Sequence, residues 1–212
     1  LSVPADGGRL DLGATWFWAN EPRVNAIVAA AGLSTFPQHL DGDAMFQNAQ
    51  GSQRMEGNQI DAPSGRLAAG TQSIAEAVAD RLPGHVVQLS TTVTGVVAEL
   101  DAVTVNASRG SVAAQHVVIA VPPATAVARI DFGGQLTDRM NALAAATPVW
   151  MGNIVKVVAQ YERPFWRHAG LAGSAFSYVG PMRELHDMSG ADGQPAAIFG
   201  FAQPGAGNEA PT

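Results

Sequence analysis

The strongest candidate for a catalytic residue in this sequence is a lysine within an apolar stretch. Residues 153–161 alternate as a β-strand does, which places Lys156 between Ile154 and Val158 on one face and an apolar row on the other. Partial burial disfavours the ammonium and lowers a lysine pKa towards neutrality. The pattern therefore predicts that Lys156 points into the interior or a cleft. The alternative is a lysine on an edge strand whose charge prevents another strand from pairing with it.

A second candidate is a stretch of small residues followed by aromatic ones, Gly13, Ala14, Thr15, Trp16 and Phe17. Small residues let a backbone approach a flat ligand, and the aromatic side chains supply apolar walls. The alternative is a core strand kinked at a glycine. Upstream, Gly7 and Gly8 favour a hairpin turn, because a dinucleotide-binding loop needs the G-x-G-x-x-G spacing and a following helix.

Both stretches resemble the flavin-dependent amine oxidase family, which includes the monoamine and polyamine oxidases. The resemblance is carried by the lysine strand with the PFW at residues 164–166 and by the DLGAT at residues 11–15. It implies FAD as the cofactor and Lys156 as the catalytic residue, holding a water molecule against the reactive flavin nitrogen. The cofactor contacts that it implies are Gly13, Ala14, Thr15, Trp16, Val93, Ala120, Val121 and Pro122.

The activity that the resemblance implies is oxidation of a small-molecule amine to an imine, with reduced FAD reoxidised by O₂. Residues 38–65 form only a hairpin-sized loop where family members usually insert a long helical segment. A non-catalytic binding or interaction module built on the same scaffold is therefore an alternative function. A related FAD enzyme, such as a carotenoid desaturase or protoporphyrinogen oxidase, is a third.

We expect the chain to be an internal fragment of a longer protein. It opens with Leu1 and enters a strand-like segment almost at once. We expect it to lack the N-terminal dinucleotide-binding motif and the C-terminal segment that completes the flavin site. The isolated fragment is accordingly predicted to hold no FAD and to be inactive, because the phosphate-binding helix N-terminus is missing.

Composition narrows the class of protein. The 212 residues are 47% hydrophobic and 14% charged, with a net charge of −6 and no cysteine. Such a chain can bury a core, and it has neither a basic cluster for nucleic acid or an anionic membrane nor thiols for disulfides. No signal peptide is recognised, and a cytoplasmic location is expected. The histidines are isolated, so no metal site is predicted; His186 and Asp187 are expected in a surface turn.

The fold predicted from these patterns is a mixed α+β and α/β fragment of two lobes. Residues 1–36 and 67–146 are assigned to a partial FAD-binding lobe, and residues 37–66 and 147–212 to a substrate lobe with a mostly antiparallel sheet. Helices are expected at 21–31 with Asn20 as the N-cap, at 72–82, at 124–130 and at 136–146 with Leu143 facing inward. Strands are expected at 8–14, 33–37, 44–48, 52–56, 86–89, 93–100, 103–107, 112–120, 153–161 and 196–202.

Overall fold

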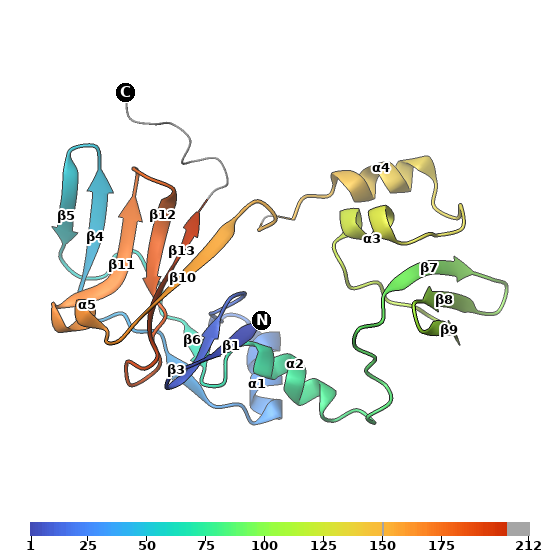
Figure 1. Cartoon of the computed structure of the whole chain (residues 1–212), viewed down its shortest axis with the longest axis horizontal. Helices are drawn as coiled ribbons and strands as arrows, with labels where there is room; N and C mark the ends of the chain where they lie inside the picture. Colours follow the sequence, from blue (N-terminus) through green and yellow to red (C-terminus); the bar gives the residue numbers. More distant parts are fainter. Residues whose placement is uncertain (150, 203–212) are drawn as a thin grey trace. The chain divides into compact units, whose positions relative to one another are not determined.

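A computed structural model describes residues 1–149 and 151–202 of the chain. The chain forms two compact units, one of Leu1–Leu82 with Asn153–Thr212 and one of Pro83–Gly152. Figure 1 labels most of their helices and strands. Each unit is described by itself.

The first unit is built on a six-stranded sheet with the strand order β10-β13-β12-β11-β4-β5 (Figure 1). All neighbours are antiparallel except β4 and β11, which run parallel. The predicted mixed sheet is therefore confirmed. Its strands are β4 (Asp43–Asn48), β5 (Gly51–Met55), β10 (Val155–Tyr161), β11 (Leu171–Ser177), β12 (Met182–Asp187) and β13 (Ala196–Ala202).

Shorter elements complete this unit. The hairpin of β1 (Ser2–Ala5) and β2 (Gly8–Asp11) turns at Gly7, whose φ of 89° lies in the left-handed region that favours glycine. A second antiparallel pair joins β3 (Thr35–Pro37) to β6 (Gly65–Leu67). The helices are α1 (Pro22–Ala31), which ends at a left-handed Gly32, α2 (Gln72–Ala79) and the short α5 (Phe165–His168).

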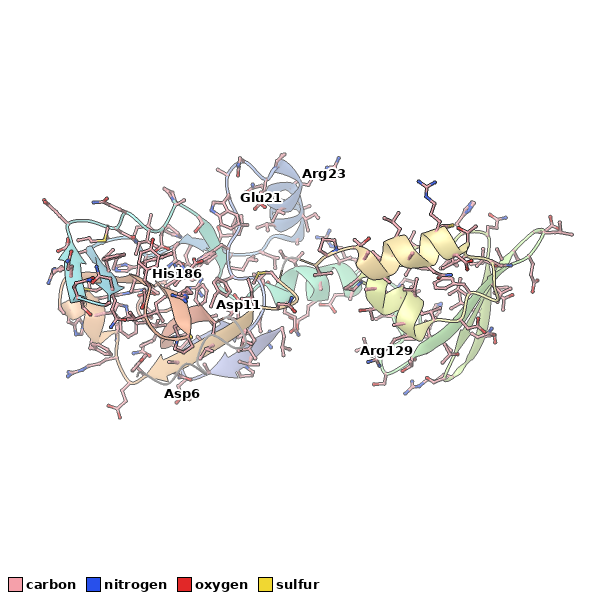
Figure 2. All side chains as sticks on the ribbon, turned by 90° about the horizontal axis from the view of Figure 1, so that it is seen from above. Asp6, Asp11, Glu21, Arg23, Arg129 and His186 are labelled. Atoms are coloured by element: carbon pink, nitrogen blue, oxygen red, sulfur yellow. The ribbon has the colours of Figure 1, made fainter. Side chains whose placement is uncertain are left out.

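The core of the first unit joins the β1–β2 hairpin to the large sheet. Leu10 of β2 is buried together with Ala197 and Phe199 of β13 and with Met188, and Trp16 packs against this cluster. Asp11 and His186 lie within the same packed interior (Figure 2), and they are only 1% and 4% exposed. Packing of the hairpin therefore brings the residues that follow β2 against the sheet.

The second unit is a three-stranded antiparallel meander with two helices. Its strands are β7 (Val93–Ala98), β8 (Val103–Ala107) and β9 (Gly110–Ala114). The helices are α3 (Pro123–Arg129), with proline in its first turn, and α4 (Asp138–Ala146), capped by the Thr137 hydroxyl. The chain returns to the meander at Asp131, whose carbonyl accepts a bond from the Val96 amide at 2.8 Å. The predicted meander is thus present.

Several local predictions were wrong. Residues 86–89 form no strand, and β9 stops at Ala114 instead of running to residue 120. Val118 is 90% exposed, because the described part of this unit gives the apolar run no neighbouring strand with which to pair. Leu143 is 68% exposed, so it does not face inward. The N-cap of α1 is Glu21 and not Asn20, and its side chain makes no capping bond.

The compact units do not follow the predicted lobes. Residues 1–36 belong to the same compact unit as the six-stranded sheet, since Leu10 of the hairpin is buried in the core of that sheet. All six strands of the sheet nevertheless fall within residues 37–66 and 147–212, the predicted substrate lobe. Which lobe faces the cofactor and which the substrate stays a prediction.

Candidate functional site

Lys156 lies in β10 on the face that the alternation predicted, and its amine meets three electron-rich partners. Nζ donates to the carbonyl oxygen of Gly13 at 2.9 Å and to the hydroxyl of Thr15. It also lies 4.1 Å from the centroid of the Phe199 ring, on the adjacent strand β13. A cation this close to a ring face is attracted by its quadrupole. The half-buried lysine is therefore held against the segment that follows β2.

That segment is fixed by Asp11, the last residue of β2. Its carboxylate accepts bonds from the Ser2 hydroxyl, from the Thr71 amide at 2.9 Å and from the Thr71 hydroxyl at 3.1 Å. The Thr71 hydroxyl also lies 2.7 Å from the carbonyl oxygen of Ala14. These bonds fix the backbone of residues 11–15 from both sides, so the two oxygen partners of Lys156 have set positions.

The environment of Lys156 changes its protonation. Burial, the largest effect, lowers the pKa of Lys156, the Asp11 carboxylate raises it and the Arg66 guanidinium lowers it, so that the resulting pKa is about 8. A neutral amine is therefore accessible near physiological pH. Lys156 is also the only lysine in the 212-residue sequence. The predicted inward orientation is confirmed, while its catalytic role stays a prediction.

A second polar cluster lies on the other side of Phe199. His186 of β12 packs against the Phe199 ring with centroids 5.2 Å apart and against Trp16 at 4.9 Å. Its Nδ1 lies 2.6 Å from a carboxylate oxygen of Asp61, and its Nε2 lies 3.3 Å from the carboxylate of Glu184. Phe199 thus separates the lysine from a histidine held between two carboxylates.

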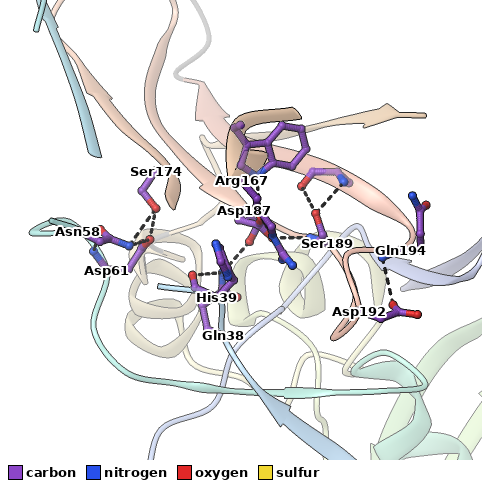
Figure 3. Close-up of polar contacts among 12 residues, drawn as sticks. Gln38, His39, Asn58, Asp61, Arg167, Ser174, Asp187, Ser189, Asp192 and Gln194 are labelled. Atoms are coloured by element: carbon purple, nitrogen blue, oxygen red, sulfur yellow. Dashed lines mark hydrogen bonds and ion pairs between the residues drawn. The ribbon is translucent and has the colours of Figure 1, made fainter. Parts of the chain in front are cut away.

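Asp61 is the centre of this cluster. Besides His186, it accepts bonds from the amide of Asn58 at 3.0 Å and from the hydroxyl of Ser174 (Figure 3). Burial alone would raise the pKa of Asp61, but the hydrogen bonds from His186, Asn58 and Ser174 outweigh it and hold the pKa below its ordinary value of 3.8. The carboxylate is therefore charged at neutral pH.

The cluster borders a hollow of about 180 Å³ in the first unit. Trp16 and Trp18 form part of its wall, with ring centroids 6.2 Å apart, and Asp61, Glu184 and His186 form another part. Aromatic faces together with carboxylates suit a small organic cation. The Trp16 ring also contacts Phe199 at 5.1 Å between centroids, and Phe199 carries Lys156 on its ring face. Two contacting aromatic rings, Trp16 and Phe199, therefore lie between the hollow and the lysine.

Sequence reasoning missed this part of the site. His186 and Asp187 were expected in a surface turn, but they are 4% and 0% exposed at the end of β12. The signal available in the sequence was the alternation of β12, which the His-Asp pair ends. Asp61 and Glu184 carried no recognisable motif, because Asp61 meets His186 from 125 positions away.

The predicted cofactor contacts divide between the two units. Gly13, Ala14, Thr15 and Trp16 all lie in the first unit, close to Lys156 or to the hollow. Val93 begins β7 of the second unit, and Ala120, Val121 and Pro122 form an exposed segment directly before α3. Ala120 does not end a strand as expected, because β9 stops at Ala114, and the contact of all these residues with FAD stays a prediction.

The fold is that of FAD-dependent amine oxidases. The structure of wild-type putrescine oxidase bound to putrescine superposes with a TM-score of 0.86, covering 97% of this chain and 67% of that one at 18% identity. Cyclohexylamine oxidase from Brevibacterium oxydans IH-35A matches with a TM-score of 0.81, covering 93% of this chain and 65% of that one at 16% identity.

Sequence comparison gives the family directly. The profile of the family described as flavin containing amine oxidoreductase matches residues 39–209, so the chain belongs to this family. A probable flavin-containing monoamine oxidase A of Dictyostelium discoideum is 31% identical over 137 residues, which are 64% of this chain and 29% of that protein. Putrescine oxidase of Kocuria rosea is 30% identical over 189 residues, which are 84% of this chain and 35% of that protein. The chain thus spans about a third of these relatives.

None of the helices in residues 1–149 and 151–202 has the length and apolar character needed to cross a membrane. In the same residues, no three His, Asp or Glu side chains gather in a way that could hold a metal ion.

Proposed function

We propose that this chain supplies the lysine and the substrate-facing sheet of an FAD-dependent amine oxidase. The observation that carries the proposal is the pair of hydrogen bonds from Lys156 Nζ to the Gly13 carbonyl oxygen and the Thr15 hydroxyl, in a chain of the amine oxidoreductase family. The lysine and the segment expected to face the flavin ring are 143 positions apart in sequence, and the fold joins them. Membership of the family alone does not require this contact.

The residues beside Lys156 suit a flat cofactor. A Cβ atom at Gly13 would meet only the Leu1 nitrogen, at 3.4 Å, which is an ordinary contact. Packing within the chain therefore does not require glycine here, whereas close approach of a ring to the backbone does. Gly13 and Ala14 are also exposed. These two residues, with Thr15 and Trp16, would hold the ring, and bound FAD would supply the acceptor for the hydride of the amine.

In this proposal the chain itself contributes Lys156 as a group that accepts and donates protons, and a cavity that binds the substrate. With a pKa of about 8, Lys156 Nζ would take up and release a proton near neutral pH. The hollow between Trp16, Trp18 and the Asp61–His186 pair would bind a small amine, with its apolar part on the indoles. The indole and carboxylate walls support a small organic amine as the substrate class.

The test is flavin reduction in the protein encoded by the complete gene. Anaerobic mixing with small amines should bleach the oxidised flavin spectrum, and Lys156→Met should slow reduction or reoxidation while the fold is kept. Met fills a similar volume without the amine. Unchanged rates in both half-reactions would remove the catalytic role of Lys156, whereas a wild-type flavin that small amines do not bleach would favour a non-catalytic binding module.

We further propose that the 212-residue chain by itself does not retain FAD. The contacts assigned to the ring cover only part of a long ligand, and association still costs translational and rotational freedom. The purified chain should be colourless, and added FAD should not raise its melting temperature, because a ligand stabilises only the state that it binds. A yellow preparation, or stabilisation by micromolar FAD, would contradict this proposal.

A further inference from the structure

The three partners of Lys156 Nζ differ in what they can do. The carbonyl oxygen of Gly13 and the ring face of Phe199 are both electron-rich and can only accept. The hydroxyl of Thr15 can accept through its oxygen or donate its hydrogen. An ammonium has three N–H groups, so the protonated lysine is satisfied by all three partners at once.

The neutral amine is harder to accommodate. It has two N–H groups and one lone pair, and the lone pair is repelled by a carbonyl oxygen or a ring face. Thr15 is the one of the three partners that can donate to it. The Thr15 hydroxyl lies 3.4 Å from the Gly13 carbonyl oxygen, so its hydrogen has a second acceptor while the lysine is charged. Rotation about one bond then turns that hydrogen towards Nζ.

We propose that Thr15 is a positioning residue that holds Lys156 Nζ in the same place in both protonation states, accepting a bond from the ammonium and donating one to the amine. Thr15 is 4% exposed, so water does not easily replace its hydroxyl. The proposal deepens the proposed function, in which Lys156 exchanges a proton. It concerns a contact within the chain, and therefore it can be tested without FAD.

The effect on Lys156 has a definite direction. A hydrogen bond to a charged donor is stronger than one to a neutral donor, so the Thr15 hydroxyl stabilises the ammonium more than the amine. Loss of the hydroxyl should therefore lower the pKa of Lys156 further. Asp11 and Arg66 are the charged groups that act on this amine, and His186 lies behind Phe199. Substitution of Thr15 removes no charge, so their effects stay constant.

The sequence makes the measurement unusually direct, because Lys156 is its only lysine. Labelling with ¹⁵N-lysine gives a single side-chain signal, whose chemical shift follows the protonation of Nζ through a pH titration. Thr15→Val keeps the branched shape without the hydroxyl, and Thr15→Ser keeps the hydroxyl without the methyl group. Thr35→Val, at an exposed position in β3, is the matched control. Lys156→Met confirms the assignment of the signal.

We expect Thr15→Val to lower the pKa of Lys156 by about 1, while Thr15→Ser and Thr35→Val leave it within about 0.2 of the wild-type value. The line width of the Nζ signal should also change in Thr15→Val above the pKa, where the amine loses its donor. An unchanged or raised pKa in Thr15→Val would overturn the proposal. If Thr15→Val does not fold, Thr15→Ala provides the same comparison.

The outcome is separate from that of the oxidase test. A lowered pKa in Thr15→Val together with normal flavin kinetics in Lys156→Met would sustain the positioning role of Thr15 and remove the proposed catalytic role of Lys156. An unchanged pKa with slowed flavin kinetics in Lys156→Met would do the reverse.

Discussion

Arg167 and Asp187 form a bidentate ion pair that connects α5 to the end of β12. The guanidinium donates from Nε and from Nη2 to the two carboxylate oxygens, each at 2.8 Å (Figure 3). The same carboxylate accepts from the Trp166 indole at 2.7 Å and from the Ser189 amide at 2.7 Å. Asp187 is fully buried, so the carboxylate that accepts these bonds is shielded from water.

Asp187→Asn should destabilise the chain severely. It leaves the Arg167 guanidinium without its charged partner, and breaking a buried pair costs about 3–5 kcal/mol. Urea denaturation measures the loss. The matched control is Glu76→Gln, which breaks an exposed pair with Arg9 at 3.6 Å and should cost less than about 1 kcal/mol. Equal losses in the two variants would show that Asp187 does not stabilise this junction.

Gly173→Ala should be far more damaging than Gly57→Ala. Both glycines have a left-handed φ, 79° and 71°, so both substitutions carry the same backbone strain of about 1–2 kcal/mol. A Cβ at Gly173 would also meet the Trp166 indole nitrogen at 2.7 Å and Asp187 Cβ at 2.9 Å, whereas Gly57 faces open space. Overpacking should add about 1–3 kcal/mol to the loss at Gly173 in urea denaturation. Similar losses at both positions would contradict this packing.

Lys156 should make stability rise with pH in the alkaline range. Its pKa is about 8 in the folded chain and near its ordinary value of 10.5 in the unfolded chain, so the unfolded chain binds more protons between these values. The free energy of unfolding should therefore increase across this interval by up to about 3 kcal/mol. Denaturation of the wild type and of Lys156→Met along a pH series measures the difference. Parallel curves would show that burial does not lower this pKa.

Asp61 should make stability rise with pH in the acid range. Its folded pKa is below 3.8, so the stability that it contributes is complete above that value and is lost as the pH falls through the folded pKa. Asp61→Asn should destabilise the chain at neutral pH by about 1–3 kcal/mol, because a charged acceptor of buried hydrogen bonds is lost. It should also flatten the acid limb of the stability curve. An acid limb identical to that of the wild type would contradict this role.

Local patterns predicted much of the secondary structure. The Gly7 turn, the helix ending at Gly32 and the paired strands at 43–55 follow from turn and capping chemistry within a few residues. The apolar run at residues 116–121 was misassigned because a buried strand depends on neighbours, which a sequence pattern does not show.

The site was predictable only in part for the same reason. Lys156 stood out because a cation interrupts an apolar alternation, and Gly13 because small residues precede aromatic ones. The contact between Thr15 and Lys156 spans 141 positions. Such contacts follow from the packing of Leu10 against β13, which no local pattern encodes.

The parallel pairing of β4 with β11 bears on how the chain reaches its fold. Strand partners such as Gln47 and Ser177 are 130 positions apart, and the whole second unit lies between them in sequence. Closing so long a loop must precede any gain from the pairing, so the first unit should fold slowly for its size. Early collapse of residues 83–152 would shorten the effective loop. Until that closure, the β4–β5 hairpin keeps an unpaired edge on which copies of the chain can associate during refolding.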